Sequence, residues 1–237
     1  MFLCCVEFLY KIILLIRNRL FDLGFNIKKA DAYVISVGNI TLGGTGKTPI
    51  VIALARQFKD KGKNIAVITR GYKNADEPKM FSQILPDVPI LINKNRYVSA
   101  NLAIQKYGAE IIILDDGYQH RKLFRNLNIL LIDAANPFGN YHIFPAGILR
   151  EQLSELKRAD IVILTKTNFI SDLSLIKKQI HKYHPAVKIL ESKVEAVNME
   201  FIKGKNVILI SAIGNPKFFK QQIELLGANI LKSVEYS

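Results

Sequence analysis

VGNITLGGTGKTP, residues 37 to 49, is the stretch that decides the fold of this chain. A run of Gly and Thr that ends in Gly-Lys-Thr is typical of loops that cradle phosphate groups. The usual spacing of such a loop, G-x-x-x-x-G-K-[ST], requires a glycine at position 41, and this sequence has Thr41 there. The motif alone leaves the nature of the loop open, so its surroundings must decide.

The loop lies between a predicted strand and a predicted helix. The apolar run YVISVG (33–38) leads into it, and PIVIALARQFKDKG (49–62) has the pattern of a helix. Glycines let backbone N–H groups turn toward phosphates, and the start of the helix adds its dipole. We expect Lys47 to reach the β- and γ-phosphates and the Thr48 hydroxyl to bind Mg²⁺. The predicted nucleotide-binding residues are Thr41, Leu42, Gly43, Gly44, Thr45, Gly46, Lys47 and Thr48.

Short aliphatic runs recur along the chain and alternate with helical stretches such as VSANLAIQKYG (98–108) and SLIKKQIHKYHP (174–185). The runs are continuously apolar, as in strands that are buried on both faces of a parallel sheet. The pattern predicts an α/β fold, a P-loop NTPase-like, doubly wound, mostly parallel sheet. The predicted strands are YVISVG (33–38), NIAVIT (64–69), IIILDD (111–116), NILLID (128–133), IVILTK (161–166) and NVILIS (206–211).

Two carboxylates, Asp115 and Asp116, end the predicted strand IIILDD (111–116). Adjacent acids at a strand end are the arrangement by which P-loop enzymes hold Mg²⁺ or orient its water ligands. The plainer alternative is that the pair caps a turn with Gly117.

The N-terminal segment, FLCCVEFLYKIILLI (2–16), is almost wholly apolar. It is too short to span a bilayer. One interpretation is a helix of the globular core. The other is an interfacial helix that lies on a membrane, with Arg17 and Arg19 reaching for lipid phosphates. At helical spacing, four polar residues of this region fall along one narrow stripe: Glu7, Lys11, Asn18 and Asp22.

The chain is strongly basic, with 33 Lys and Arg against 20 Asp and Glu, for a formal net charge of +13. Such an excess fits an anionic partner, which could be nucleic acid, acidic lipid or a phosphorylated substrate. Because the sequence contains no RNA-binding aromatic motif and no helix-turn-helix spacing, we expect no nucleic-acid partner.

Several motifs occur in the order of one known family. Together they resemble tetraacyldisaccharide 4'-kinase, a lipid A biosynthetic enzyme, from about residue 10 to the end of the chain. The family also has Thr at the position of Thr41, so the departure from the general motif supports the resemblance. The motifs are GNITLGGTGKTP (38–49), RGY (70–72), DDGYQHR (115–121), FGN (138–140) with PAG (145–147), and LRE (149–151).

The resemblance implies a reaction and a location. The reaction is transfer of the γ-phosphate of ATP to the 4'-hydroxyl of a tetraacyldisaccharide 1-phosphate, with Mg²⁺ as cofactor. The location is the cytoplasmic face of the bacterial inner membrane, as a peripheral or monotopic protein. The expected partners are therefore the lipid A disaccharide precursor and an anionic membrane surface, with no obligate protein partner, and the interfacial interpretation of the N-terminal segment is favoured.

The resemblance also implies roles for individual residues. Thr48, Asp115 and Glu151 would form the metal shell. Lys47, Asp116, Arg96 and His120 would lie near the phosphates as catalytic residues. For Arg96 the alternative is a surface residue at a helix start, and for His120 a hydrogen-bonded structural histidine.

The expected general base is a carboxylate, because a sugar hydroxyl is a poor nucleophile at neutral pH. The family places a catalytic Asp in a Gly-Asp-Glu segment downstream of RGY, and the match here is Asp76, followed by Glu77. Ala75 replaces the family's Gly, and the loop after Tyr72 is shorter than usual. The alternatives are a solvated loop acid at Asp76 and a base at the strand-end pair.

The expected organisation is a membrane-associated helix (1–26), a P-loop kinase core (27–195) and a smaller C-terminal subdomain (196–237). In the family, the last of these leads into an Asp-His-His motif and a further stretch. We expect that subdomain to be incomplete here, so that this chain binds Mg-ATP and is a weak kinase.

Other nucleotide-dependent functions remain as alternatives. One is a membrane-recruited P-loop ATPase that acts as a switch or positions other proteins, but it would need a signature Lys early in the loop, where Leu42 stands. Another is a GTPase, which would need a guanine-reading Asn-Lys-x-Asp after a strand. The corresponding run is TKTN (165–168), which lacks the Asp.

Overall fold

A computed structural model describes residues 2–71, 76–195, 201–213 and 216–236. The chain divides into two compact units, Met1–Ser192 and Lys193–Ser237.

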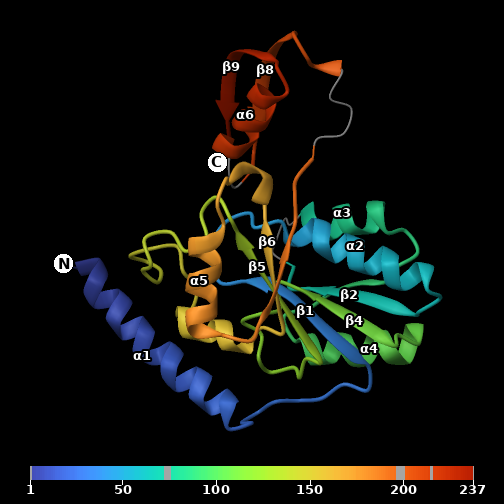
Figure 1. The fold of residues 1–237 in the computed structure, drawn as a ribbon. Coiled ribbons are helices and arrows are strands. Elements are labelled where there is room, and N and C mark those ends of the chain that lie inside the picture. Colours follow the sequence, from blue (N-terminus) through green and yellow to red (C-terminus); the bar gives the residue numbers. More distant parts are fainter. Residues whose placement is uncertain (1, 72–75, 196–200, 214–215, 237) are drawn as a thin grey trace. The chain divides into compact units, whose positions relative to one another are not determined.

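The first unit is built on a seven-stranded sheet in which every pair of neighbouring strands is parallel (Figure 1). The strand order is β3-β2-β4-β1-β5-β6-β7. The predicted doubly wound parallel fold is confirmed. The strands are β1 (Tyr33–Asn39), β2 (Ile65–Thr69), β3 (Ile90–Ile92), β4 (Ile111–Asp115), β5 (Leu127–Asp133), β6 (Ile161–Thr165) and β7 (Lys188–Glu191).

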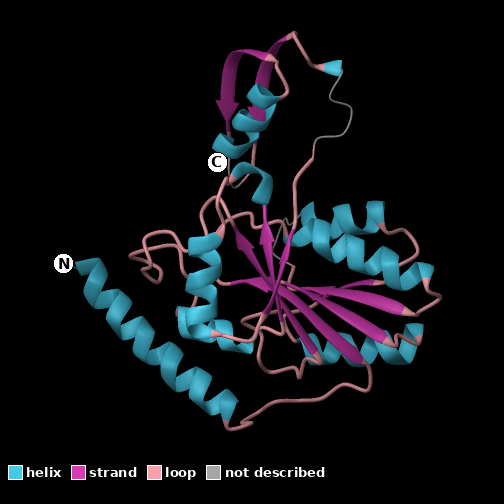
Figure 2. Cartoon of the chain, viewed as in Figure 1, coloured by secondary structure: helices cyan, strands magenta, loops and turns pink. Residues whose placement is uncertain are grey.

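Helices cover both faces of this sheet (Figure 2). On one face, α2 (Lys47–Asp60) and α3 (Asp76–Ile84) pack on a core that includes Ile35 and Val37 of β1. On the other face, α4 (Arg96–Tyr107) packs over Val34 and the neighbouring strands. Also on this second face, α5 (Ser174–Tyr183) and the 3₁₀ helix η1 (Leu153–Arg158) cover β5 and β6. Alternate residues of the central strands therefore enter opposite cores, which explains why these strands read as continuous apolar runs.

The first helix, α1 (Phe2–Asp22), turns its polar stripe toward the protein. Glu7 and Asn18 are buried, and Leu14 lies in the core, with Tyr10 packed against it. Arg121 donates to the Asn18 carbonyl oxygen at 3.1 Å and pairs with Asp22 at 2.6 Å. The stripe therefore fastens the helix to the first unit.

Glu7 makes several contacts of this kind. Its carboxylate accepts the Ile143 N–H at 2.9 Å, pairs with Lys11 at 2.7 Å and lies 2.8 Å from Nδ1 of His142. Burial alone would raise the pKa of Glu7, but these hydrogen bonds and the Lys11 charge lower that pKa to about 2. The buried carboxylate is thus ionised and fully partnered at neutral pH.

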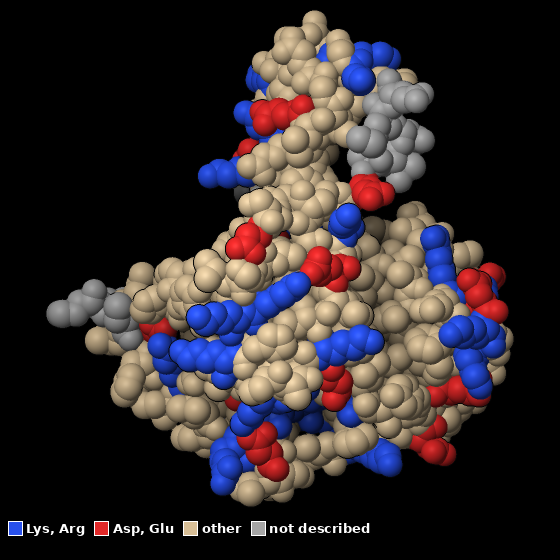
Figure 3. All heavy atoms as spheres, in the orientation of Figure 1, with Lys and Arg blue, Asp and Glu red and all other residues tan. Residues whose placement is uncertain are grey.

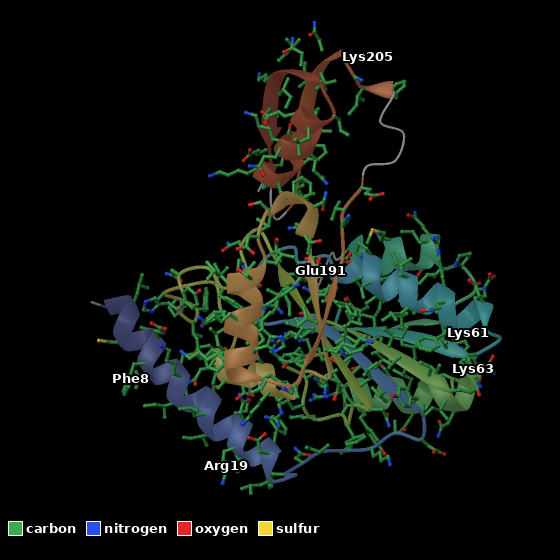
Figure 4. All side chains as sticks on the ribbon, in the orientation of Figure 1. Phe8, Arg19, Lys61, Lys63, Glu191 and Lys205 are labelled. Carbon is green, nitrogen blue, oxygen red and sulfur yellow. The ribbon has the colours of Figure 1, made fainter. Side chains whose placement is uncertain are left out.

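The outward side of α1 is apolar. Phe8 and Arg19, labelled in Figure 4, both lie on the exposed part of the helix. In Figure 3 the surface along the N-terminal half of α1 is largely uncharged. Within the described residues, no helix is both long enough and apolar enough to cross a membrane. The large exposed apolar side chains are Leu3, Phe8, Leu9, Ile12, Ile13, Leu15, Ile16 and Leu20.

The second unit contains β8 (Asn206–Ser211), α6 (Pro216–Leu225) and β9 (Asn229–Glu235). Its two strands are parallel and are joined through the helix. The run NVILIS is thus a strand as predicted, in a separate small sheet.

The contact between β1 and the turn after β4 leaves no room for a side chain at Gly38. A Cβ added there would lie 2.7 Å from both the backbone nitrogen and the Cβ of Tyr118. Gly38→Ala should therefore destabilise the fold by about 1–3 kcal/mol in urea unfolding, because the clash is with backbone. Gly44→Ala is the matched control, since its added methyl group meets nothing within 4 Å. Equal stability of the two variants would contradict this account.

Candidate active site

The cradle begins where β1 ends and closes at the first residue of α2. Gly43 and Gly46 adopt positive φ angles of 110° and 82°, which a glycine tolerates and other residues rarely do. Lys47 opens α2, and its Nζ lies 3.3 Å from Oδ1 of Asn39 and 3.6 Å from Oδ1 of Asp116. The strand, loop and helix are arranged as a phosphate cradle requires.

Thr41 has a structural explanation. It forms an antiparallel bridge with Leu149, flanked by the hydrogen bonds Leu42 N–H to Ile148 O and Arg150 N–H to Ile40 O, each 2.7 Å. A β-branched residue suits such an extended, paired position, where no glycine is needed. Thr41 is buried and Leu42 is exposed.

Thr45, deeper in the cradle, is also buried. Its hydroxyl has no hydrogen-bond partner among the residues that the structure describes. A buried hydroxyl of this kind in a phosphate cradle is available to a ligand oxygen.

A pocket of about 530 Å³ lies next to the cradle. Five of its lining residues are cationic, and Asp116 is the one acid among those described. The pocket therefore favours an anionic ligand. Its lining residues are Tyr10, Arg17, Leu42, Arg70, Lys94, Arg96, Asp116, Gln119, His120, Phe144 and Arg150.

Asp116 is the acid that the structure brings to the cradle. Arg150 Nη1 contacts its two carboxylate oxygens at 2.8 and 2.9 Å, and Lys47 Nζ lies 3.6 Å from Oδ1. Burial by itself would raise the pKa of Asp116, but Lys47 and Arg150 hold that pKa below its usual range. Asp116 is therefore an anion between two cations.

Asp115 is placed differently. It is buried at the end of β4, and its backbone oxygen lies 3.5 Å from Nη2 of Arg96. Thr48 lies on the first turn of α2 and lines a different, mostly apolar cleft beside α3. Within the described ranges, no group of three or more His, Cys, Asp or Glu side chains could hold a metal ion.

Arg96 and His120 line the pocket together. Arg96 is buried at the start of α4 and donates to the Asn93 carbonyl oxygen at 2.7 Å. His120 is half-buried, and burial, followed by the charges of Arg96 and Arg125, lowers its pKa to about 4. His120 is therefore neutral at physiological pH.

Glu151 lies away from the pocket lining. Its carboxylate is fully buried and is bound by Arg17 of α1 and Arg158 of η1. Two guanidinium groups already satisfy its oxygens, so the structure gives Glu151 a part in holding α1. Arg17, which was expected to reach lipid phosphates, pairs with this buried carboxylate and also lines the pocket.

The expected base, Asp76, is the first residue of α3. Its side chain, that of Glu77, and the whole of Tyr72 and Ala75 lie outside the described residues.

The sequence interpretation gave no role to Arg150, Lys94 or Gln119. Gln119 donates to the Asn39 carbonyl oxygen at 2.8 Å and so braces the cradle. Arg150 lies inside the motif LRE and Gln119 inside DDGYQHR, so the sequence had already marked both positions as parts of family motifs. Lys94 follows the short strand β3 and lies in none of the quoted family motifs.

These features define a class of protein. A parallel α/β sheet with a Gly-rich loop between its central strand and a helix, a Lys at the helix start and an acid after the adjacent strand is the architecture of a P-loop nucleotide-binding protein.

Comparison with known proteins defines the family. The family model described as tetraacyldisaccharide-1-P 4'-kinase matches residues 1–75 and 74–237, so the chain belongs to that family of lipid A biosynthetic kinases. The predicted family is confirmed, and with it the prediction of an enzyme.

Individual relatives agree. A tetraacyldisaccharide 4'-kinase of Halothermothrix orenii is 34% identical over 283 residues, which cover 99% of this chain and 73% of that protein. One of Aquifex aeolicus is 35% identical, covering 97% of this chain and 79% of that protein. A solved structure, described as the "apo" form of LpxK from Aquifex aeolicus in complex with ATP, superposes with a TM-score of 0.78 at 30% identity. It covers 98% of this chain and 80% of that chain.

The lowered pKa of His120 predicts a pH effect on stability. Between its unfolded pKa near 6.5 and its folded pKa of about 4, the unfolded chain binds a proton that the folded chain does not. Stability is therefore lost as the pH falls through this window. In urea unfolding at pH 7 and pH 5, His120→Gln should lose less stability than the wild type. His181→Gln, an exposed position on α5, is the control and should leave the wild-type loss in place. Identical losses for His120→Gln and the wild type would contradict the assignment.

Proposed function

We propose that this chain transfers the γ-phosphate of ATP to the 4'-hydroxyl of a tetraacyldisaccharide 1-phosphate. The observation that carries the proposal is the ion pair of Lys47 with Asp116, an acid that lines a cationic pocket. The decisive assay is incubation with labelled ATP and tetraacyldisaccharide 1-phosphate, followed by detection of the 4'-phosphorylated lipid. ATP hydrolysis without transfer would favour the switch ATPase instead.

Catalysis rests on positioning and on neutralising charge, because phosphoryl transfer gives the protein little covalent chemistry to perform. In this proposal Lys47 binds the β- and γ-phosphates, while the N–H groups of the cradle and the start of α2 support them. Arg96 and Arg150 stabilise the negative charge that spreads over the transferred group. Neutral His120 can donate or accept one hydrogen bond without adding charge.

Mg²⁺ is the expected companion of ATP, and it would neutralise charge on the β- and γ-phosphates. The Thr48 hydroxyl and the carboxylates of Asp115 and Asp116 are the hard oxygen donors that this ion prefers. These groups are therefore suitable ligand types for Mg²⁺. Glu151 fits less well, because Arg17 and Arg158 hold its carboxylate.

The acceptor hydroxyl needs a base. Asp76, at the start of α3, remains the proposed one by resemblance. Asp116 is the alternative, but its lowered pKa makes it a weak proton acceptor while Lys47 and Arg150 hold it.

The acceptor is proposed to enter from the side of α1. Tyr10 and Arg17 of this helix line the same pocket as Asp116, so the helix forms part of the site wall. The apolar outward face of α1 suits the hydrocarbon–headgroup boundary of a bilayer, where the acyl chains of the substrate lie. We therefore propose that the protein works at an anionic membrane surface, on the cytoplasmic face of the inner membrane.

Lys47→Ala should lower the rate of phosphate transfer on the order of 10²-fold or more, because it removes the mobile charge on the terminal phosphates. The measurement is initial rate with saturating lipid. Lys61→Ala, at the opposite end of α2, is the matched control and should keep the wild-type rate (Figure 4). A normal rate for Lys47→Ala would refute the phosphate role.

The double variant Leu9→Glu, Ile13→Glu should weaken binding to anionic vesicles by at least about tenfold, because both side chains would leave the apolar boundary. These residues are 62% and 61% exposed, so the fold does not depend on them. Leu175→Glu, 75% exposed on α5, is the control. Vesicle sedimentation measures the effect, and unchanged binding of the double variant would show that α1 is not the membrane contact.

A further inference from the structure

The segment TKTN (165–168), at the end of β6, touches the cradle directly. Oγ1 of Thr165 donates to the Thr45 carbonyl oxygen at 3.0 Å, and Nζ of Lys166 donates to the Gly44 carbonyl oxygen at 3.1 Å. The Lys166 ammonium is buried and is also bound by Asp133 of β5. Two side chains thus fix this segment against the phosphate loop.

The sheet order decides which end of a nucleotide this segment meets. The cradle follows β1, and the acid that contacts Lys47 follows β4, the neighbour of β1 on one side. β6 lies on the opposite side of β1, beyond β5. A nucleotide that lies along the cradle with its terminal phosphate at Lys47 therefore extends its base toward β6, at the carboxyl edge where ligands of parallel sheets bind.

Asn168 is the exposed residue of this segment. Lys166 has a left-handed backbone, with φ of 60°, and turns the chain from β6 into the 3₁₀ helix η2 (Thr167–Phe169), a single turn in Figure 2. Thr167 is buried, and its hydroxyl donates to the Ser192 carbonyl oxygen at 3.2 Å. The two residues before Asn168 are buried and are held by side-chain hydrogen bonds, which constrains the position of Asn168 relative to the cradle.

We propose that Asn168 reads the base of the nucleotide and sets the preference for adenine over guanine, an inference that rests on the proposed ATP-dependent function. An amide offers one donor and one acceptor. The N6 amine of adenine donates and its N1 accepts, so one side chain can bond to both. The N1–H and N2 amine of guanine both donate, and that edge calls for a carboxylate.

Asn168→Asp tests this chemistry with a nearly isosteric change. The carboxylate loses the donor to adenine N1 and gains an acceptor for guanine, so the ratio of ATP to GTP affinity should fall by at least about tenfold. The measurement is calorimetric titration of the full chain with ATP and with GTP, in parallel with binding of tripolyphosphate. Tripolyphosphate affinity should change little, because it has no base.

The control Asn26→Asp, an exposed asparagine in the loop after α1, adds the same charge elsewhere and should keep the wild-type ratio. A wild-type ratio in Asn168→Asp, with ATP still bound, would overturn the inference and leave the kinase proposal standing. Absence of ATP binding by the wild-type chain would instead overturn the proposed function.

Discussion

The arrangement of the site depends on one short backbone pairing. Residues 40–42 at the start of the cradle bond to residues 148–150 through two hydrogen bonds of 2.7 Å. Neighbouring side chains of an extended segment point to opposite sides. The pairing therefore sends Arg150 to Asp116 in the pocket and its neighbour Glu151 into the interior between Arg17 and Arg158. One contact thus sets both the charge around the phosphates and the attachment of α1.

That attachment explains why α1 turns its polar side toward the protein and its apolar side outward. Buried carboxylates are costly unless they are paired, and both Glu7 and Glu151 are bound by cations and hydrogen-bond donors. A helix in a soluble protein usually turns its apolar side inward. Here polar contacts hold the helix, so its large apolar side chains remain outside. A surface of this kind is typical of a membrane or protein contact, and in the proposed function that contact is with the membrane that carries the lipid substrate.

Much of the fold could be predicted from the sequence, because strands buried on both faces give continuous apolar runs. The run IIILDD is such a case, since Ile112 and Ile113 enter opposite cores. The short strand β3 and the largely exposed β7 and β9 lack this signal and were missed. The polar stripe of α1 was visible in the sequence. The direction in which it points depends on partners more than 90 residues away in the chain, and spacing alone does not reveal these partners.

The site was predictable in its motifs and less so in its contacts. Lys47, Arg96, Asp116 and His120 gather as expected, although their roles stay predictions. Glu151 was assigned to the metal by resemblance alone, and only the structure shows the two arginines that hold it. Arg150 was missed because a cation next to an acid in a motif gives no sign of which one reaches the site. That assignment depends on the register of the pairing with residues 40–42.

The electrostatics of the pocket bear on what kind of nucleotide enzyme this is. Asp116 serves as an internal counter-ion for Lys47 and Arg150, so nucleotide phosphates compete with it for the same cations. The remaining cations, Arg17, Arg70, Lys94 and Arg96, surround a space of about 530 Å³ that continues to α1. An enzyme that only hydrolyses a nucleotide needs room for water beyond the terminal phosphate. A pocket of this size, lined by Tyr10 of α1 and by Phe144 as well as by these cations, has room for a second substrate beside the phosphates. The geometry therefore favours transfer to a lipid-borne acceptor over hydrolysis.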